Sequence, residues 1–294
     1  MMSAKQDTSN DMMSCCASCG KTEGDGVQLR TCDACKSVRY CGVTCQRNHR
    51  PMHKKTCKKR AAELRDEILF KQPESSHLGD CPICVLPLPV DMTYVYFECC
   101  SKVVCRGCVY ANFKREKEER LEHSCPFCRA TGDGDRNLMN MKRIQANDPS
   151  ALCDMGTTHY KEGKYAEAFQ YLSKAAELGN TIAHYNLSMM YLNGQSVKND
   201  ERKYVHHLEE AAIGGHPEAR YNLAYYETSK GRIDRGVKHW TIAANQGNDK
   251  SMGALKESYK VGKVSKEDFA SALRAYQVAV NATKSPQREA AKQY

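Results

Sequence analysis

The most regular pattern of apolar and polar residues lies in the second half of the chain. Two kinds of short segment recur there, the first rich in alanine and the second in tyrosine and leucine. They are KAAELGN (174–180), EAAIGGH (210–216) and IAANQGN (242–248), and AHYNLSMMY (183–191), ARYNLAYY (219–226) and SMGALKESY (251–259), at spacings of 36 and 32 residues. ALCDMGTTHY, from residue 151, adds one earlier period. Such periods, with a glycine near the end of each helix pair, predict four stacked helical hairpins over residues 150–283.

The small and large residues of this pattern have different roles. Alanine and glycine let neighbouring helices approach closely, whereas tyrosine and leucine fill the shared core. We expect Trp240 and Cys153 to belong to that core. His206 and His207 are adjacent on a helix and face different directions, so we expect no metal site there. No catalytic constellation is visible in this half, and the concave surface of such a stack typically binds proteins or peptides.

The first half carries shorter elements separated by polar stretches. Residues 109–120, VYANFKREKEER, predict a short amphipathic helix with a charged outer face, while QPESSHLGD (72–80) and TGDGD (131–135) are typical of linkers. The expected organisation is a disordered start (1–14), a cysteine-rich segment (15–57), a helix and linker (58–80), a second cysteine-rich segment (81–129), a linker (130–149), the helical repeats (150–283) and a C-terminal tail (284–294).

Composition excludes some classes of protein. The chain has 294 residues, of which 41% are hydrophobic, and its mean hydropathy is −0.67. No apolar run approaches the roughly 18–20 residues of a spanning helix, and the first residues lack the apolar core of a signal peptide. We therefore expect an intracellular protein, cytoplasmic or nuclear, with no membrane contact. The net charge of +9 raises nucleic acid as a partner.

Cysteine is the most unevenly distributed residue. Of the 17 cysteines, eight lie between residues 15 and 57, eight between residues 81 and 128, and Cys153 stands alone. Pairs two residues apart, in a chain expected to stay in a reducing compartment, favour metal ligation over a disulfide framework.

The first cluster contains four ligand pairs within 42 residues. The pairs are Cys16 and Cys19, Cys32 and Cys35, Cys41 and Cys45, and His53 and Cys57. A gap of two residues presents two thiolates from a tight turn, and a gap of three suits ligands one helical turn apart. Cys15 is an alternative to Cys16, and His49 is an alternative to His53.

The segments CASCGK and CDACKSVRYCGVTCQRNHRPMHKKTC, within residues 16–57, resemble a MYND-type zinc finger. That resemblance implies alternating sets, with Cys16, Cys19, Cys41 and Cys45 on one zinc ion and Cys32, Cys35, His53 and Cys57 on the other. It also implies docking of short proline-containing peptides from partner proteins. The family usually has tryptophan three residues before the histidine ligand, where this chain has Arg50, so one aromatic wall of a peptide groove is missing. The lysine methyltransferases that contain such fingers need a catalytic domain for which residues 58–80 leave no room.

The second cluster contains Cys81-Pro-Ile-Cys84, Cys99-Cys100, Cys105-x2-Cys108 and Cys125-Pro-Phe-Cys128, and it resembles a RING-type finger in its all-cysteine form. The family's cross-braced arrangement implies one zinc ion on Cys81, Cys84, Cys105 and Cys108 and another on Cys99, Cys100, Cys125 and Cys128. Adjacent side chains of an extended strand point to opposite faces, so Cys99 and Cys100 can share a metal only if the backbone turns there. His123 is the alternative ligand if one of these two cysteines is spare.

A RING has no nucleophile or general base. It binds a ubiquitin-conjugating enzyme and holds the conjugated ubiquitin in a reactive pose, which is catalysis by positioning. The resemblance places Ile83, Pro126, Phe127 and Arg129 at the docking positions. Alternatively, Ile83 and Phe127 only cover the zinc ions and Arg129 is a solvated charge, so the sequence leaves open whether the chain is an enzyme.

The residues together predict small zinc-stabilised α+β fingers followed by an all-α solenoid, with about four zinc ions per chain. The KAAxLG and AxYNLxxxY spellings of the repeats resemble Sel-1-like repeats. The leading functional hypothesis is a zinc-binding intracellular protein-interaction protein whose MYND-type finger and Sel-1-like repeats select protein partners, and which is a candidate RING-type ubiquitin ligase. A non-enzymatic scaffold is the alternative, and a nucleic-acid-associated regulator is a lesser one based on the run HKKTCKKR (53–60). Zinc-bound thiolates offset most of the positive charge, which weakens the case for nucleic acid.

Overall fold

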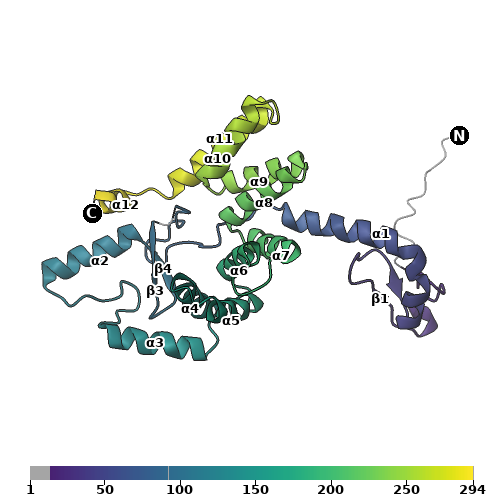
Figure 1. Ribbon diagram of the computed structural model, residues 1–294, viewed down its shortest axis with the longest axis horizontal. Helices are drawn as coiled ribbons and strands as arrows, with labels where there is room; N and C mark the ends of the chain where they lie inside the picture. The colour runs from purple at the N-terminus through teal and green to yellow at the C-terminus, as the bar shows by residue number, and fades with distance from the viewer. Residues whose placement is uncertain (1–13, 92, 294) are drawn as a thin grey trace. The chain divides into compact units, whose positions relative to one another are not determined.

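We describe the fold from a computed structural model of the chain, which describes residues 14–91 and 93–293 (Figure 1). The predicted disordered start over residues 1–14 therefore lies almost wholly outside the described residues. The chain forms two compact units, residues 1–71 and residues 72–294. Within the described ranges, none of the helices combines the length and the apolar character that crossing a bilayer requires.

The first unit contains the first cysteine module, residues 14–57, and one long helix. Its elements are the 3₁₀ turn η2 (Glu23–Asp25), the short antiparallel strands β1 (Arg30–Thr31) and β2 (Arg39–Tyr40), and helix α1 (Val43–Leu69). The apolar core contains little besides Leu29, Val38 and Tyr40, packed on buried cysteines. Because so small a core cannot stabilise a fold alone, the module depends on the groups that its cysteines hold.

The second unit begins with the second cysteine module, residues 81–129. It has an antiparallel hairpin of β3 (Tyr94–Phe97) and β4 (Lys102–Cys105), followed directly by helix α2 (Arg106–Glu119). A helix is thus present over nearly all of the predicted residues 109–120, but its buried side chains include the polar Asn112 and Glu116, so the predicted amphipathic pattern is wrong. Leu88 and Val104 form the buried aliphatic core of the second cysteine module and pack between its cysteines.

A stack of antiparallel helix pairs forms the rest of the unit and confirms the predicted solenoid. The helices are α3 (Asp133–Gln145), α4 (Pro149–Lys161), α5 (Tyr165–Glu177), α6 (Thr181–Asn193), α7 (Glu201–Ile213), α8 (Pro217–Ser229), α9 (Ile233–Ala244), α10 (Asp249–Lys260), α11 (Lys266–Ala282) and the short α12 (Pro286–Ala290), followed by η3 (Ala291–Gln293). Side chains cap the N-termini of α6, α8 and α10 at equivalent repeat positions, Asn180, His216 and Asn248.

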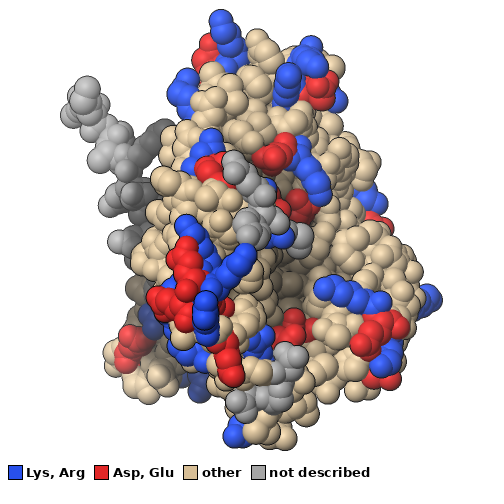
Figure 2. Space-filling view, turned by 90° about the vertical axis from the view of Figure 1, so that its left-hand side faces the viewer, with Lys and Arg blue, Asp and Glu red and all other residues tan. Residues whose placement is uncertain are grey.

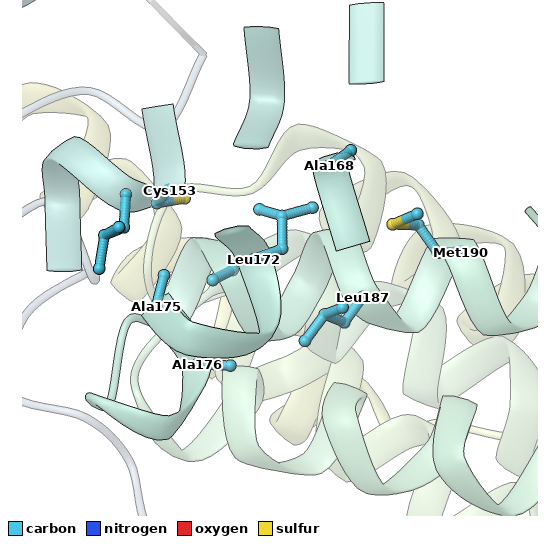
Figure 3. Close-up of a cluster of buried hydrophobic side chains, with 9 residues drawn as sticks. Cys153, Ala168, Leu172, Ala175, Ala176, Leu187 and Met190 are labelled. Atoms are coloured by element: carbon cyan, nitrogen blue, oxygen red, sulfur yellow. The ribbon is translucent and has the colours of Figure 1, made fainter. Parts of the chain in front are cut away.

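The core of the first repeats shows why the sequence alternates small and large residues. Ala168, Ala175 and Ala183 are fully buried and let the helices approach, and Leu172 and Met190 fill the space between them (Figure 3). Cys153 is 5% exposed in the same cluster, as expected from the sequence. Trp240 is 8% exposed and packs in the core of the later repeats, so it too is a packing residue.

Two segments that the sequence analysis treats as linkers have definite structure. Residues 130–149 contain helix α3. Residues 72–78 lie along the loops of the repeats: the His77 N–H donates to the Gly215 carbonyl at 3.1 Å, and the Gln246 side chain donates to the Ser75 carbonyl at 3.3 Å. The His77 ring stacks on His216 with a centroid distance of 4.2 Å. The second cysteine module is therefore attached to the repeats at its entry as well as through the chain that follows it.

Candidate metal centres

The structure brings sixteen candidate ligands together in four groups of four. In each group the ligand atoms all lie within 4.8 Å of one another. The groups are Cys16, Cys19, Cys41 and Cys45; Cys32, Cys35, His53 and Cys57; Cys81, Cys84, Cys105 and Cys108; and Cys99, Cys100, Cys125 and Cys128. These are the four sets that the family resemblances imply. In both modules the sets interleave along the chain.

The spacing of the ligand atoms fits tetrahedral zinc. Zn–S bonds of about 2.3 Å place two sulfurs about 3.8 Å apart on a tetrahedral ion. The sulfur–sulfur distances are 3.6 Å for Cys19–Cys41, 3.8 Å for Cys32–Cys57, 3.8 Å for Cys84–Cys105 and 3.9 Å for Cys100–Cys125. All 17 cysteines lie in the described part of the chain, and each is a free thiol. Three sets of four thiols and one of three thiols with an imidazole are donor sets typical of structural zinc, so the protein has about four zinc sites.

Four of the five ligand pairs two residues apart share one backbone conformation, and these pairs begin at Cys16, Cys32, Cys81 and Cys125. The fifth pair, Cys105 and Cys108, lies at the start of helix α2. In each of the four, the first cysteine accepts a hydrogen bond from the N–H of the residue after the second cysteine, at 2.8–3.0 Å. That residue has a positive φ each time: Gly20 at 73°, Lys36 at 54°, Val85 at 57° and Arg129 at 65°. A β-branched valine rarely adopts this conformation, so an intrinsic preference of the chain does not explain the turn at Val85. The shared turn is what a metal ion held by both cysteines would select.

The surroundings of Cys81 lower the pKa of its thiol. A hydrogen bond from the Cys105 thiol lowers the pKa of Cys81 to about 4, although burial opposes the shift. The lowered pKa favours the thiolate of Cys81, which is the form that binds zinc.

The adjacent Cys99 and Cys100 reach one site because the backbone turns between them. Residues 98–101 connect β3 to β4, with Ser101 at φ 51° and a hydrogen bond from the Cys100 N–H to the Phe97 carbonyl. The Cys99 sulfur lies 3.4 Å from that of Cys128. His123, the alternative ligand, points elsewhere and lies 2.8 Å from a Glu116 oxygen. The geometry therefore favours both cysteines as ligands.

The alternatives in the first module also lie outside the ligand groups. Cys15 pairs its backbone with Thr22, while the neighbouring Cys16 sulfur lies in the first group. His49 contacts the Tyr40 hydroxyl at 3.0 Å and stacks on His53, whose Nε2 lies 3.3 Å from the Cys35 sulfur. His49 thus supports the ligand ring from outside the group.

Comparison with known proteins agrees with this geometry. Residues 16–57 match the MYND finger family, and residues 149–180, 181–216 and 217–248 match the Sel1 repeat family. The chain contains a MYND finger and three Sel1 repeats. Each matched Sel1 repeat is one helix pair, α4 with α5, α6 with α7, and α8 with α9. The fourth predicted hairpin corresponds to α10 and α11, which lie beyond the matched residues.

The proteins similar to this chain include a curated relative and two solved structures, described below. DAP3-binding cell death enhancer 1 from Mus musculus is 25% identical over 175 residues, which are 46% of this chain and 34% of that protein. The chain thus spans about a third of this curated relative's length. A Sel1 repeat protein from Oxalobacter formigenes is 30% identical over 42% of this chain and 98% of its own, with a TM-score of 0.38. The antigen c5321 from uropathogenic Escherichia coli, which has an SLR fold, is 20% identical over 63% of this chain and 39% of its own, with a TM-score of 0.39.

The four predicted docking residues around the second module differ in exposure. Ile83 is 41% exposed and Phe127 is 42% exposed, whereas Pro126 between the last two ligands is buried. Arg129 is exposed, and its guanidinium donates to the Asn112 side chain at 2.7 Å. Two apolar side chains are thus available at the surface beside the metal sites.

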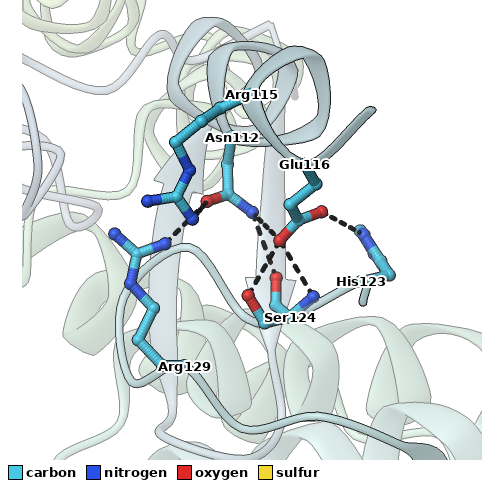
Figure 4. A network of polar contacts seen from close by, with 6 residues as sticks. All are labelled: Asn112, Arg115, Glu116, His123, Ser124 and Arg129. Carbon is cyan, nitrogen blue, oxygen red and sulfur yellow. Dashed lines mark hydrogen bonds and ion pairs between the residues drawn. The ribbon is translucent and has the colours of Figure 1, made fainter. Parts of the chain in front are cut away.

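A polar network centred on Glu116 fixes the segment that leads into Cys125 (Figure 4). Glu116 is 4% exposed and accepts hydrogen bonds from the Ser124 N–H at 3.0 Å, the Ser124 hydroxyl at 2.8 Å and the Asn112 amide at 2.6 Å. Burial acts to raise the pKa of Glu116, but the hydrogen bonds from Ser124, His123 and Asn112 outweigh it and lower the pKa to about 2. The ionised carboxylate therefore stabilises the fold above its usual pKa of 4.5, and this contribution is lost as the pH falls toward 2.

We expect Glu116→Gln to destabilise the zinc-loaded protein at pH 7. Glutamine keeps one acceptor oxygen but loses the charge and places an N–H₂ group against donors, which costs about 1–3 kcal/mol. Thermal unfolding followed by circular dichroism measures the change. Glu118→Gln is the matched control, because Glu118 lies on the same helix with its side chain 65% exposed. Equal midpoints for the two variants would contradict a structural role for the network.

Two side chains that contact ligand sulfurs were not identified from the sequence. Ser37 donates to the Cys35 sulfur at 3.0 Å, and Arg288 donates to the Cys84 sulfur at 3.4 Å. The proximity of Ser37 to a ligand pair is a usable sequence signal. Arg288 lies 204 residues from Cys84 in a segment predicted as a tail, and the sequence carries no signal for it.

Proposed function

We propose that this zinc-binding protein-interaction protein is a RING-type ubiquitin ligase whose MYND finger and Sel1 repeats select the partners. The proposal assigns the sixteen grouped residues as zinc ligands and residues 81–129 as the ligase module. The observation that carries it is the interleaving of two cysteine sets around the β3–β4 hairpin and α2. This arrangement holds Ile83 and Phe127 on the surface, beside different zinc sites.

The mechanism that follows is positioning. Ile83 and Phe127 would form the apolar contact with a ubiquitin-conjugating enzyme, and Arg129 would act on the conjugated ubiquitin. Asn112 holds the Arg129 guanidinium, and pre-ordering a long side chain lowers the entropy lost on binding. The zinc ions supply the rigidity of the surface and take no part in bond making.

Ile83→Ala tests the proposal because it removes an exposed apolar contact and leaves every ligand in place. We expect the wild-type protein to support ubiquitin chain formation with at least one of a broad panel of conjugating enzymes, and Ile83→Ala to lose most of this activity while retaining about four zinc ions. Leu121→Ala is the control, because Leu121 is an aliphatic residue 50% exposed in the same module. Wild-type activity in Ile83→Ala, or no activity across the panel, would rule the proposal out.

A non-enzymatic scaffold is the second candidate, favoured by a different observation. Pro126 is buried, and the Lys102 ammonium lies 5.9 Å from the centre of the Phe127 ring, so part of the docking surface is occupied by the module itself. In that case Ile83→Ala would capture the same partners as the wild type, and no ubiquitin transfer would be detected with either.

Nucleic-acid binding is the least supported candidate. The run 53–60 contains the grouped His53 and Cys57, and Arg60 pairs with Glu63 and Glu67 at 3.2 and 3.0 Å. On the face shown in Figure 2, basic and acidic side chains lie side by side. Binding to DNA or RNA that weakens steeply with added salt would revive this candidate.

A further inference from the structure

The end of the chain returns to the second cysteine module. Helix α11 ends at Ala282, and the five-residue helix α12 (Pro286–Ala290) packs against α2. Ser285 caps α12 by accepting a hydrogen bond from the Arg288 N–H at 3.2 Å. The turn thus fixes the direction in which Arg288 leaves the backbone.

Arg288 is 7% exposed, and its guanidinium binds the turn that carries the first ligand pair of the module. It donates to the Pro87 carbonyl at 2.7 Å, to the Leu86 carbonyl at 3.1 Å and to the Cys84 sulfur at 3.4 Å. A fourth hydrogen bond, to the Thr283 carbonyl at 2.7 Å, ties the same group to the end of α11. One side chain therefore joins the repeats to the metal-binding turn.

The contact depends on a glycine between two ligands of the same site. A Cβ atom at Gly107 would lie 2.9 Å from Arg288 Cγ and 3.0 Å from its backbone N and Cα. Because the backbone of α12 cannot move away while Arg288 keeps its four hydrogen bonds, only glycine allows this approach. Gly107 lies between Cys105 and Cys108, the second ligand pair of the site, and Arg288 also contacts Cys84 of the first pair. Helix α12 therefore lies against both ligand pairs.

The charges explain why an arginine can be buried here. A guanidinium stays ionised and is costly to bury without an anionic partner. Three of the hydrogen-bond acceptors described for Arg288 are carbonyl oxygens, and the acceptors that can carry a charge are the sulfurs of two ligands, Cys84 and Cys105. A zinc ion with four thiolates carries a net charge of −2, which the guanidinium offsets at close range.

We propose that α12 is an integral part of the second cysteine module and that Arg288 is a positioning residue that retains zinc at the Cys81, Cys84, Cys105 and Cys108 site. Because Arg288 is also bonded to the Thr283 carbonyl at the end of α11, zinc retention at this site depends on the end of the repeat stack. The proposal rests on the assignment of these four cysteines as ligands. It does not depend on ubiquitin transfer.

Zinc release from the 294-residue chain tests the proposal. With a chromogenic chelator in excess, we expect Arg288→Ala to release one zinc ion of about four some 10–100-fold faster than the wild type, because losing a group that contacts a ligand typically lowers metal affinity about 10–100-fold and we expect the loss in the dissociation rate. We expect Arg288→Lys to be intermediate, because lysine keeps the charge but cannot make all four contacts. Lys292→Ala, which removes a cation 61% exposed in the same segment, should release zinc like the wild type.

Alkylation of cysteines during release, mapped by mass spectrometry, shows which site has opened. The proposal requires Cys81, Cys84, Cys105 and Cys108 to react first in Arg288→Ala, while the MYND finger cysteines keep their wild-type rates. It is overturned if Arg288→Ala retains all its zinc as the wild type does, or if all four sites open together. Failure of every ubiquitination assay would leave these outcomes unchanged.

Discussion

Chelation of zinc under reducing conditions is expected to unfold both cysteine modules while most of the repeat helices persist. The apolar core of the MYND finger contains little besides Leu29, Val38 and Tyr40, and that of the second module is comparably small. Structural zinc contributes about 10–16 kcal/mol of apparent binding free energy in small modules at pH 7, which exceeds the stability of many whole domains. Without the ion, no interaction compensates for the unfavourable positive φ at Val85 or for the close approach of the four thiols.

The repeats differ because they bury their own core. Leu172, Leu208 and Leu255 are each fully buried in the helix stack, far along the chain from any candidate ligand. We therefore expect far-ultraviolet circular dichroism to retain most of its helical signal after chelation, since α4 to α10 need no metal. The lost signal should come from α2 and from the part of α1 that carries Cys45, His53 and Cys57.

Three measurements on one sample check this expectation. Metal analysis should give about four zinc ions before chelation. Hydrogen exchange should show that residues 16–57 and 81–128 lose protection after chelation. Adding zinc back should restore the zinc content and the protection of both segments. Protection that survives complete zinc removal would contradict the account of either module. Loss of all helical signal would instead show that the repeats depend on the second module for their fold.

The ligand sets could be predicted because their information is local. Two-residue gaps define the tight turns, and α1 places His53 and Cys57, which belong to one ligand group, about one helical turn apart on one face. The pair Cys99 and Cys100 was harder, since its role depends on a turn at residues 98–101 that spacing alone does not predict. The resemblance to a RING-type finger implied that both cysteines bind one zinc ion, and the turn of the β3–β4 hairpin explains how both sulfurs reach it.

Two of the features missed from the sequence depend on long-range contacts. Residues 72–78 have the composition of a linker, yet they bind loops of the repeats through His77 and Ser75. The tail predicted over residues 284–294 carries Arg288, whose partners lie about 200 residues earlier. Neither segment has an apolar pattern that indicates burial, because both are held mainly by hydrogen bonds to backbone carbonyls.

Replacing one ligand is expected to remove one zinc ion, whereas replacing the adjacent alternative should remove none. In the MYND finger, Cys16→Ser leaves Cys19, Cys41 and Cys45 with three thiolates and an open position, so we expect about three zinc ions per chain. Cys15→Ser alters a residue outside the ligand group and should keep about four. The two variants make the same chemical change at neighbouring positions, so the difference between them reports ligation alone.

The second module allows the same comparison for its least regular site. Cys100→Ser breaks the set of Cys99, Cys100, Cys125 and Cys128, so we expect it to lose that zinc ion and to expose the other three thiols to alkylation. His123→Ala removes only the contact with Glu116, so its zinc content should be unchanged while its thermal midpoint falls slightly. Loss of zinc in His123→Ala with retention in Cys100→Ser would reverse the assignment. The β3–β4 turn would then be a strained connection with one spare thiol, and the module would bind its second metal through the segment that follows α2.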